Sequence, residues 1–541
     1  MHNIFAAVRN VAEATERGND ERREPVELYL DTFEVGVREY GDRPLIISGD
    51  DSWTYAEMDR LASRIAQGLI AAGLEPGSHV AVYSPNHAYG FACQWGLLRA
   101  GCVWVPINYR MGAAPMASAV ESLDVDWLFY HSALEADVAA VADRVRGLVC
   151  LDQAGTTAPS MDDWLPSELD PAIELPKRSA GDTAALLLTS GTTGTPKGIV
   201  VSNHAWVSAQ EGFDRLVSYD EAPRHLVVAP ITHAAGMYAA TLHPHGGTHI
   251  LMSTTRPSEV LCAIEKHRAT TLFVPPTLLY MMLADPEVST FDYSSLRTIV
   301  YGTAPMSPAK AREAWDVFGP VLMQGYGQSE ALMVIAALSV EDHREAITNP
   351  EHAKRLESVG RPTPGISVEV MSARGEILPP GEPGEIVVQG GIVMDGYYKN
   401  PESTAEAKSF GWHHTGDIGV FDEDGFLYII DRKKDMIISG GFNIFPSEIE
   451  RAILSHRDVQ DCAVVGIPDD KWGEAVMAAV QLKPEATATA DDMKTHCRAL
   501  LGGLKVPKEI VLLGDLPRSG NGKVLRRAIR DPYWAGRSRS V

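Results

Sequence analysis

The chain has 541 residues, of which 45% are hydrophobic and 22% charged, and its formal net charge is −23. This length predicts two or three folding units with a large core, and the acidic balance argues against a general binder of nucleic acid or anionic membrane. Six cysteines without a C-x-x-C pair argue for a reducing compartment and against a disulfide framework or a zinc site.

The first half of the chain alternates strand and helix patterns. Thr54 and Glu57 fit a capping box, and the apolar spacing that follows predicts a helix ending near Gly73. Strand 79–85, helix 91–102 and strand 103–107 follow with short turns, which predicts a mostly parallel sheet. Six more strands are predicted at 125–131, 147–152, 184–190, 225–231, 248–254 and 270–276.

The pattern of predicted elements changes after residue 365. Short strands at 366–372, 384–390 and 419–430 are separated by glycine turns, which predicts a β meander or a small barrel. From residue 435 onward, helices 444–455 and 491–501 alternate with strands 461–468, 474–482 and 509–513, which indicates a compact α+β domain of common size. We therefore divide the chain into residues 1–431 and 435–541, joined at 432–434.

A glycine- and hydroxyl-rich loop, "TSGTTGTPKG", follows the strand at 184–190. Such loops cradle phosphates with backbone N–H groups, and Lys197 adds a positive charge. The loop does not fit the G-x-x-x-x-G-K-[ST] pattern, because Lys197 follows a proline and precedes Gly198. The alternative is an ordinary surface turn, and a match to a phosphate-binding loop over ten residues argues against it.

Five more stretches follow in order: "PITHAAG" (230–236), "YGTAPMS" (301–307), "QGYGQSE" (324–330), "WHHTGD" (412–417) and "DRKKDMIISGGFNIFPSEIE" (431–450), with "SGNGK" near the end. Together with the loop, this set resembles the adenylate-forming superfamily of acyl-CoA synthetases, luciferases and peptide-synthetase adenylation domains, from about residue 26 to 529. The resemblance implies an α/β fold: a large N-terminal domain of several subdomains (parallel α/β sheets plus a small β-barrel) and a small mobile α+β C-terminal domain.

The implied reaction joins a carboxylate to the α-phosphate of ATP with release of pyrophosphate, and such phosphoryl-type transfer depends on positioning and charge neutralisation. By resemblance, Lys523 is the catalytic lysine, because its ammonium can bridge two anions. Glu330 is the implied Mg²⁺ ligand, and His233 orients the carboxylate or gates the acyl pocket. The alternative for His233 is a purely structural histidine.

The resemblance also assigns the adenosine end. Tyr326 stacks on adenine beside the wall formed by 302–305, while Asp417 and Arg432 hydrogen-bond the ribose. The full set of implied nucleotide- and coenzyme-binding residues is Thr189, Ser190, Gly191, Thr192, Thr193, Gly194, Lys197, Gly302, Thr303, Ala304, Pro305, Gln324, Gly325, Tyr326, Gly327, Gln328, Ser329, Asp417, Arg432, Lys434, Gly440, Gly441 and Trp472.

Lys434 stands where the family has its hinge, so the resemblance implies that residues 435–541 swing between two poses. One pose delivers Lys523, and the other presents Gly440, Gly441 and Trp472 to a pantetheine tunnel. Phe442 stands where many relatives carry Glu, which leaves the acceptor geometry open.

The substrates implied by the resemblance are a carboxylic acid, ATP and coenzyme A, with Mg²⁺. The region around His233 has no aspartate to meet an amino group, and its small residues leave room for a long or bulky apolar acid. Two alternatives stay open: an enzyme that stops at the acyl adenylate or passes the acyl group to a carrier-protein thiol or another acceptor, and a non-catalytic binding homologue.

Three histidines in "HPHGGTH" (His243, His245 and His249) look like metal ligands, but the two glycines favour a turn into a strand. The charged N-terminal stretch, the lack of an apolar run near ~18 residues and the absence of a final S-K-L lead us to expect a cytoplasmic protein without a membrane segment. A homodimer is the base-rate expectation for the oligomeric state.

Overall fold

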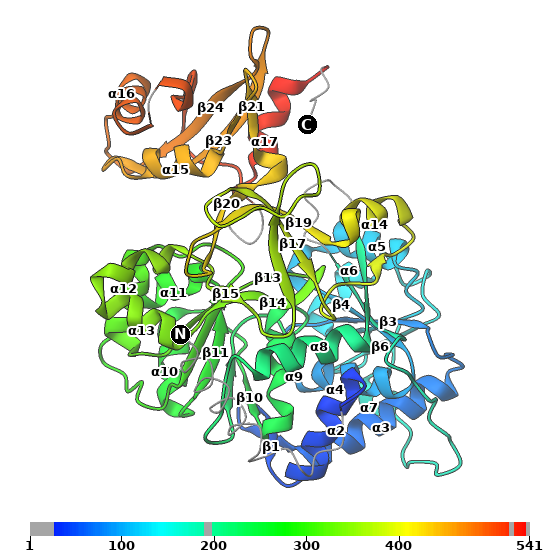
Figure 1. The fold of residues 1–541 in the computed structure, drawn as a ribbon. Helices are drawn as coiled ribbons and strands as arrows, with labels where there is room; N and C mark the ends of the chain where they lie inside the picture. Colours follow the sequence, from blue (N-terminus) through cyan, green and yellow to red (C-terminus); the bar gives the residue numbers. More distant parts are fainter. Residues whose placement is uncertain (1–25, 189–196, 502, 519–523, 537–541) are drawn as a thin grey trace, which may run out of the picture.

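The computed structural model describes residues 26–188, 197–501, 503–518 and 524–536. The described residues form two large sheets, a four-stranded sheet and a smaller α+β unit. Figure 1 shows the α+β unit, in orange and red, above the rest of the molecule. Across these described residues, no helix combines the length and apolar character that a membrane span requires.

The seven-stranded sheet is parallel through β7-β4-β3-β5-β6, and two antiparallel strands, β8 and β18, extend its β7 edge. Its strands are β3 (His79–Tyr83), β4 (Val103–Ile107), β5 (Trp127–Tyr130), β6 (Gly147–Cys150), β7 (Thr183–Leu188), β8 (Gly198–Ser202) and β18 (Gly396–Tyr397). The predicted strands and their parallel pairing are therefore present.

The nine-stranded sheet has the order β15-β14-β13-β12-β11-β9-β10-β1-β2 and is parallel from β13 to β1. Its strands are β1 (Pro44–Ser48), β2 (Asp51–Thr54), β9 (Arg224–Val227), β10 (Thr248–Leu251), β11 (Thr271–Val274), β12 (Thr298–Gly302), β13 (Leu322–Gln328), β14 (Ala331–Leu338) and β15 (Arg361–Pro362). The carboxyl ends of β12 and β13, which carry predicted site residues, lie next to each other.

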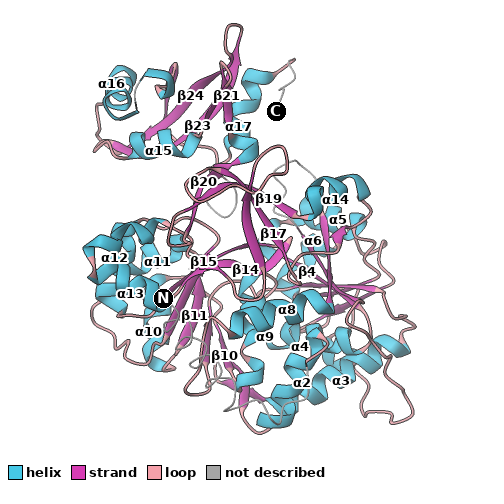
Figure 2. Cartoon of the chain, in the orientation of Figure 1, coloured by secondary structure: helices cyan, strands magenta, loops and turns pink. Residues whose placement is uncertain are grey.

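Helices cover both large sheets (Figure 2). They are α2 (Tyr29–Tyr40), α3 (Tyr55–Ala71), α4 (Ala88–Arg99), α5 (Ala113–Ser122), α6 (Glu135–Val138), α7 (Met161–Trp164), α8 (Asn203–Asp214), α9 (Ala234–Thr241), α10 (Pro257–Lys266), α11 (Pro276–Leu283), α12 (Pro308–Phe318) and α13 (Val340–Thr348). One core cluster joins Ile46 of β1, Val80 of β3 and Trp95 of α4, so α4 is buried between the two sheets. The capping box of Thr54 and Glu57 starts α3, as predicted.

The four-stranded sheet is an antiparallel meander, in the order β16 (Ser367–Met371), β17 (Gly384–Gln389), β19 (His413–Phe421) and β20 (Leu427–Arg432). Helix α14 (Pro401–Ala407) lies in the connection between β17 and β19. In the antiparallel pairing of β19 with β20, Asp417 lies opposite Arg432.

The residues after Met436 form an α+β unit with core clusters of their own. Its strands are β21 (Ile437–Ser439), β22 (Phe442–Ile444), β23 (Val459–Asp469), β24 (Gly473–Leu482) and β25 (Glu509–Leu513), and its helices are α15 (Pro446–Leu454), α16 (Ala490–Leu501) and α17 (Arg526–Arg530). Proline at the first position of α15 starts that helix, as the sequence predicts.

Candidate functional site

Asp417 lies at the centre of the predicted ribose-binding group. Its carboxylate is buried, with only 5% of the residue exposed, and it accepts a hydrogen bond from the Tyr326 hydroxyl at 2.7 Å. Its other oxygen pairs with Arg432 Nε at 3.1 Å. Burial, and then the nearby carboxylate, raise the pKa of Tyr326 well above its usual value, so the phenol stays a donor. Three residues from β13, β19 and β20 therefore meet at one point.

A close backbone approach shapes the wall beside Tyr326. Gly302 and Gly325 are register partners on β12 and β13, and a Cβ on Gly302 would lie 2.4 Å from the Gly325 carbonyl oxygen. The loop that follows is exposed at Thr303 and Pro305, and Thr303 has a φ of +67°. Strained backbone of this kind costs free energy and is common at binding sites.

Glu330 lies in the turn between β13 and β14, within a second group of predicted residues. The Tyr397 hydroxyl donates to Glu330 Oε1 at 3.1 Å, and Lys197 Nζ lies 4.9 Å from the centre of the Tyr397 ring. Lys197 also donates to Ser403 Oγ at 2.9 Å. One lysine and one carboxylate thus face the same tyrosine, which is a suitable setting for phosphate and a divalent cation.

Two predicted glutamines lie along β13. Gln328 Nε2 is 3.0 Å from His413 Nε2, and burial lowers the pKa of His413 to about 4, which leaves a neutral ring. Gln324 is buried and accepts a hydrogen bond from the Tyr301 hydroxyl, inside the sheet. Gln328 therefore connects β13 to β19, between the Asp417 and Glu330 groups.

His233 lies at the N-cap of α9, where its Nδ1 is 3.1 Å from the carbonyl oxygen of Thr232. Its side chain retains access to solvent, yet surrounding protein lowers its pKa, chiefly by desolvation. Gly236 is required here, because a Cβ would lie 1.7 Å from the Ile231 carbonyl oxygen. Within the described residues, no side-chain contact joins His233 to the Asp417 or Glu330 group.

The segment 432–434 is tied to the four-stranded sheet. Besides the Arg432–Asp417 contact, Lys433 Nζ pairs with Glu385 Oε2 at 2.9 Å. Lys434 is exposed, and its pKa is lowered, first by desolvation and then by the charge of Arg432. Just before the segment, Asp431 accepts a hydrogen bond from the Ser447 amide at 2.7 Å, which links it to α15.

The predicted coenzyme residues lie together in the α+β unit. Gly440 and Gly441 both have positive φ, and the Gly440 amide donates to the Trp472 carbonyl at 2.8 Å. A Cβ on Gly440 would lie 2.5 Å from the Trp472 ring. Trp472 and Phe442 are exposed by 45% and 59%, so this corner presents two apolar rings to its surroundings.

Several predicted residues lie outside the described residues: Thr189, Ser190, Gly191, Thr192, Thr193, Gly194 and Lys523. The three histidines that resemble a metal site do not form one. Gly246 makes the expected left-handed turn, His245 pairs with Asp214, and the rings of His243 and His249 lie in an aromatic core. Over the described ranges, no cluster of three or more His, Cys, Asp or Glu side chains is suited to a metal ion.

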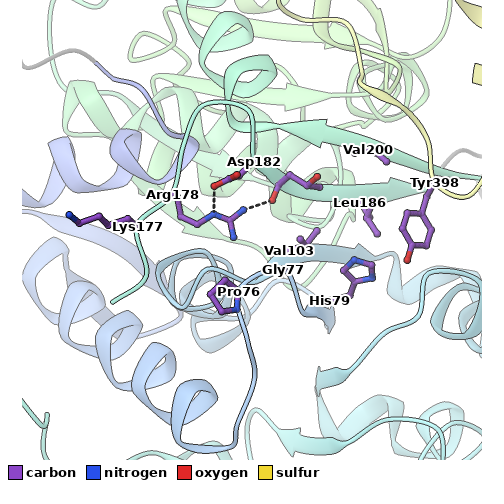
Figure 3. A pocket seen from close by; sticks show the side chains of 11 residues that line it. Pro76, Gly77, His79, Val103, Lys177, Arg178, Asp182, Leu186, Val200 and Tyr398 are labelled. Atoms are coloured by element: carbon purple, nitrogen blue, oxygen red, sulfur yellow. Dashed lines mark hydrogen bonds and ion pairs between the residues drawn. The ribbon is translucent and has the colours of Figure 1, made fainter. Parts of the chain in front are cut away.

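A separate cleft of about 330 Å³ lies at the start of β3, β4 and β7 (Figure 3). Two of its charged lining residues pair with each other: Arg178 contacts Asp182 at 3.1 Å and also donates to the carbonyl oxygens of Gly101 and Thr183. None of the predicted site residues lines it, so we do not assign it to the site.

Sequence reasoning missed four contacting residues: Tyr397, His413, Glu385 and Lys433. His413 and Lys433 lie inside the motifs at 412–417 and 431–450, whereas Tyr397 lies outside the motifs, and the partners of all three are far away along the chain. The only sequence signal for Glu385 is its position after a glycine on a strand, and that position predicts no function. Their roles depend on strand pairing.

Comparison with known proteins matches residues 33–398 to the AMP-binding enzyme family and residues 448–523 to the AMP-binding enzyme C-terminal domain. Feruloyl-CoA synthase from Amycolatopsis sp is 36% identical over 89% of this chain and 94% of its own length. The fatty acid–[acyl-carrier-protein] ligase ScoC from Streptomyces coeruleorubidus is 32% identical over 92% of this chain and 95% of its own. The structure of amide bond synthetase McbA from Marinactinospora thermotolerans superimposes with a TM-score of 0.82 at 31% identity, over 93% of this chain and 100% of that one.

Proposed function

The chain belongs to the AMP-binding enzyme family and is an acid–thiol ligase, and on this premise we propose that it activates a long or bulky apolar carboxylic acid with ATP and transfers the acyl group to coenzyme A. The observation that carries the proposal is the Tyr326–Asp417–Arg432 group beside the Glu330–Tyr397–Lys197 group. One offers ribose ligands and an aromatic ring, and the other offers phosphate and cation ligands.

In the first half-reaction, a carboxylate oxygen of the acid attacks the α-phosphorus of ATP, and the bond to the bridging oxygen of pyrophosphate breaks. The products are acyl adenylate and pyrophosphate. Asp417 and Arg432 hold the ribose, Tyr326 holds the adenine, and Lys197 with the loop 189–196 holds the departing phosphates. In this proposal, the positive charge of Lys523 offsets the repulsion between the carboxylate and the α-phosphate.

Glu330 fits a role as ligand of Mg²⁺, which prefers carboxylate and phosphate oxygens. The Tyr397 hydroxyl already orients one of its oxygens. When bound, Mg²⁺ neutralises charge on the leaving pyrophosphate.

In the second half-reaction, the thiolate sulfur of coenzyme A attacks the acyl carbon, the thioester forms, and AMP leaves with the electron pair of the broken C–O bond. Gly440, Gly441 and Trp472 line the thiol's path after residues 435–541 swing about 432–434. The separate core clusters of that unit support this boundary. His233, at the start of α9, orients the acid.

The names of two relatives support an apolar acid, since one is a feruloyl-CoA synthase and the other a fatty acid–[acyl-carrier-protein] ligase. They also define the competing acceptors: coenzyme A, a carrier-protein thiol, and an amine, as in the amide bond synthetase. We infer a cytoplasmic location from the six free cysteines, and we retain a homodimer as the expected state.

The proposal is tested by incubating the protein with ATP and Mg²⁺ and a panel of fatty, aryl and polycyclic acids. Each acid is tested with coenzyme A, with a phosphopantetheinylated carrier protein, with a simple amine, and with no acceptor. Pyrophosphate release and the acyl product are measured. We expect pyrophosphate release with at least one apolar acid and a thioester only with coenzyme A.

The Lys523→Ala variant is expected to lose pyrophosphate release by about 10²-fold or more, because removing a group that stabilises transition-state charge has an effect of that order. Full release by this variant would disprove the assigned mechanism. A carrier thioester, an amide or free adenylate in place of acyl-CoA would select the alternative acceptor. No turnover across the panel would favour a non-catalytic homologue.

A further inference from the structure

Glu385 is a buried carboxylate whose partners are neighbours of the predicted ribose ligands. It lies on β17 with 8% of the residue exposed. Its Oε1 accepts a hydrogen bond from the amide of Gly416 at 3.2 Å, and Gly416 immediately precedes Asp417. Its Oε2 pairs with Lys433 Nζ at 2.9 Å, and Lys433 immediately follows Arg432. One carboxylate therefore touches the residue next to each member of the Asp417–Arg432 pair.

A third contact keeps Glu385 in place. His414 Nδ1 lies 2.8 Å from the same Oε2, while the other ring nitrogen faces the carbonyl oxygen of Ser409 at 3.1 Å. Burial alone would raise the pKa of Glu385, but Lys433 and His414 outweigh it and hold that pKa below its usual value. The side chain is thus an anion with three donors around it.

Glu385 connects residues 415–417 to the 432–434 segment, and both have features that make this restraint useful. Gly416 has a φ of +73° inside β19, beside an irregularity in its pairing with β17, so the strand there uses backbone that few residues adopt. Arg432 is 56% exposed on its side chain, and segment 432–434 leads out of the sheet toward the α+β unit. Without a tie at each side, the Asp417–Arg432 pair would sample more arrangements before nucleotide binds.

We propose that Glu385 is a positioning residue for nucleotide: it fixes residues 415–417 of β19 and the 432–434 segment relative to each other, so that Asp417 and Arg432 meet the ribose together. This inference rests on the proposed function. Glu385 touches no substrate and acts through Gly416 and Lys433. Its effect is on the affinity for ATP and leaves the chemical step unaltered.

Three variants test this role. Glu385→Gln keeps an oxygen for the Gly416 amide but loses the charge that holds Lys433. Lys433→Met removes only the tie to the 432–434 segment, at a half-exposed position that the fold tolerates. Glu382→Gln is the matched control, since it makes the same charge change at an exposed position three residues earlier, just before β17 begins.

For each variant, the KM for ATP and kcat are measured with the best acid, the Kd for ATP is measured by calorimetry without acid, and the thermal midpoint is recorded. We expect Glu385→Gln and Lys433→Met each to raise the KM and the Kd for ATP by about fivefold, the scale of losing one partly buried charged contact. We expect kcat to change less than about twofold, and the control to match the wild type.

An unchanged KM and Kd for ATP in both folded variants would overturn the positioning role and leave Glu385 as a structural ion pair. So would an equal fall in kcat with no change in ATP affinity. If Glu385→Gln fails to fold, Lys433→Met decides alone. Failure of the proposed function is seen separately, as a wild-type protein that turns over no acid, and calorimetry with ATP still measures the effect of the variants in that case.

Discussion

The hydroxyl of Tyr326 joins the predicted adenine position to the predicted ribose position. It donates to Asp417 Oδ2, while Arg432 contacts the other oxygen of the same carboxylate. A buried carboxylate with two donors has one preferred orientation, and hydrogen bonds to charged groups are stronger than neutral ones. The three side chains, which are predicted to bind nucleotide, therefore hold one another in a single arrangement.

The Tyr326→Phe variant tests this arrangement, because it keeps the ring and removes only the donor. We expect it to lower the free energy of unfolding by about 1.5 kcal/mol, the cost of losing a hydrogen bond to a buried charge. Urea denaturation measures the change. The control is Tyr533→Phe, whose hydroxyl contacts Glu509 at 3.3 Å on an exposed surface, and it should change the free energy by less than about 0.5 kcal/mol. Equal effects of the two variants would contradict the arrangement.

The residues of the candidate site that lie in continuous motifs were predictable from the sequence. Those whose contacts depend on how distant elements pack were not. Asp417, Arg432 and Glu330 come from continuous motifs, and the structure places Asp417 and Arg432 in contact. Tyr397 of β18 contacts Glu330 in the β13–β14 turn, and Glu385 of β17 contacts Lys433 after β20, between elements whose proximity the sequence does not specify. Local pattern carries no information on which distant strands become neighbours.

Helix starts are the best example of local sequence deciding an element. Thr54 caps α3 and its hydroxyl accepts the Glu57 amide, while the Glu57 carboxylate accepts the Thr54 amide at 2.7 Å. These bonds satisfy donors that would otherwise lack partners at the helix end. They also lower the pKa of Glu57, which keeps the carboxylate ionised.

We predict that Thr54→Ala lowers the free energy of unfolding by about 1 kcal/mol. Ser202→Ala is the control, because Ser202 occupies the N-cap of α8 but makes no side-chain cap bond, and its effect should stay below about 0.5 kcal/mol. Urea midpoints of the two variants, compared at one pH, measure the difference. A Ser202 effect as large as that of Thr54 would show that the cap bond is not the cause.

At the level of elements, the long periodic strands and helices were predictable, and the shortest pieces were not. The parallel strands, the meander and the final α+β unit follow from apolar runs between glycine turns. Strands β18 and β15 have two residues each, so neither has a period to detect. They exist because a neighbouring strand edge offers hydrogen bonds.

Three buried histidines make the stability of the whole molecule depend on pH. His225, His243 and His249 are fully buried, and neither ring nitrogen of His243 has a hydrogen-bond partner in the part of the chain that the structure describes. Burial lowers the pKa of all three, that of His249 to about 3, and their mutual charge lowers it further for His225 and His243. The folded protein therefore keeps them neutral at mildly acidic pH.

This predicts a loss of stability on acidification. An unfolded histidine takes up a proton below about pH 6.5, whereas these three do not when folded. Because the unfolded state binds more protons, stability falls as the pH drops below that value, by about 4 kcal/mol for the three together between pH 7.5 and 5.5. Thermal midpoints across this range measure the fall.

The variant His243→Phe should reduce that fall by about a third, since one of the three sites no longer titrates. The control, His204→Gln, changes an exposed histidine and should leave the pH dependence as in the wild type. An identical fall in the His243 variant would mean that other groups cause the acid sensitivity.

The pairing of β18 with β8 has a consequence for how the chain is made. Gly396 and Tyr397 pair with Val200 and Ile199, although most of the nine-stranded sheet is synthesised between them. While the ribosome adds those residues, the edge of β8 has no partner, and open strand edges invite aggregation. A nascent chain that ends before residue 396 also lacks the tyrosine that orients Glu330. The outer edge of β8 is therefore completed only after Tyr397 has been synthesised.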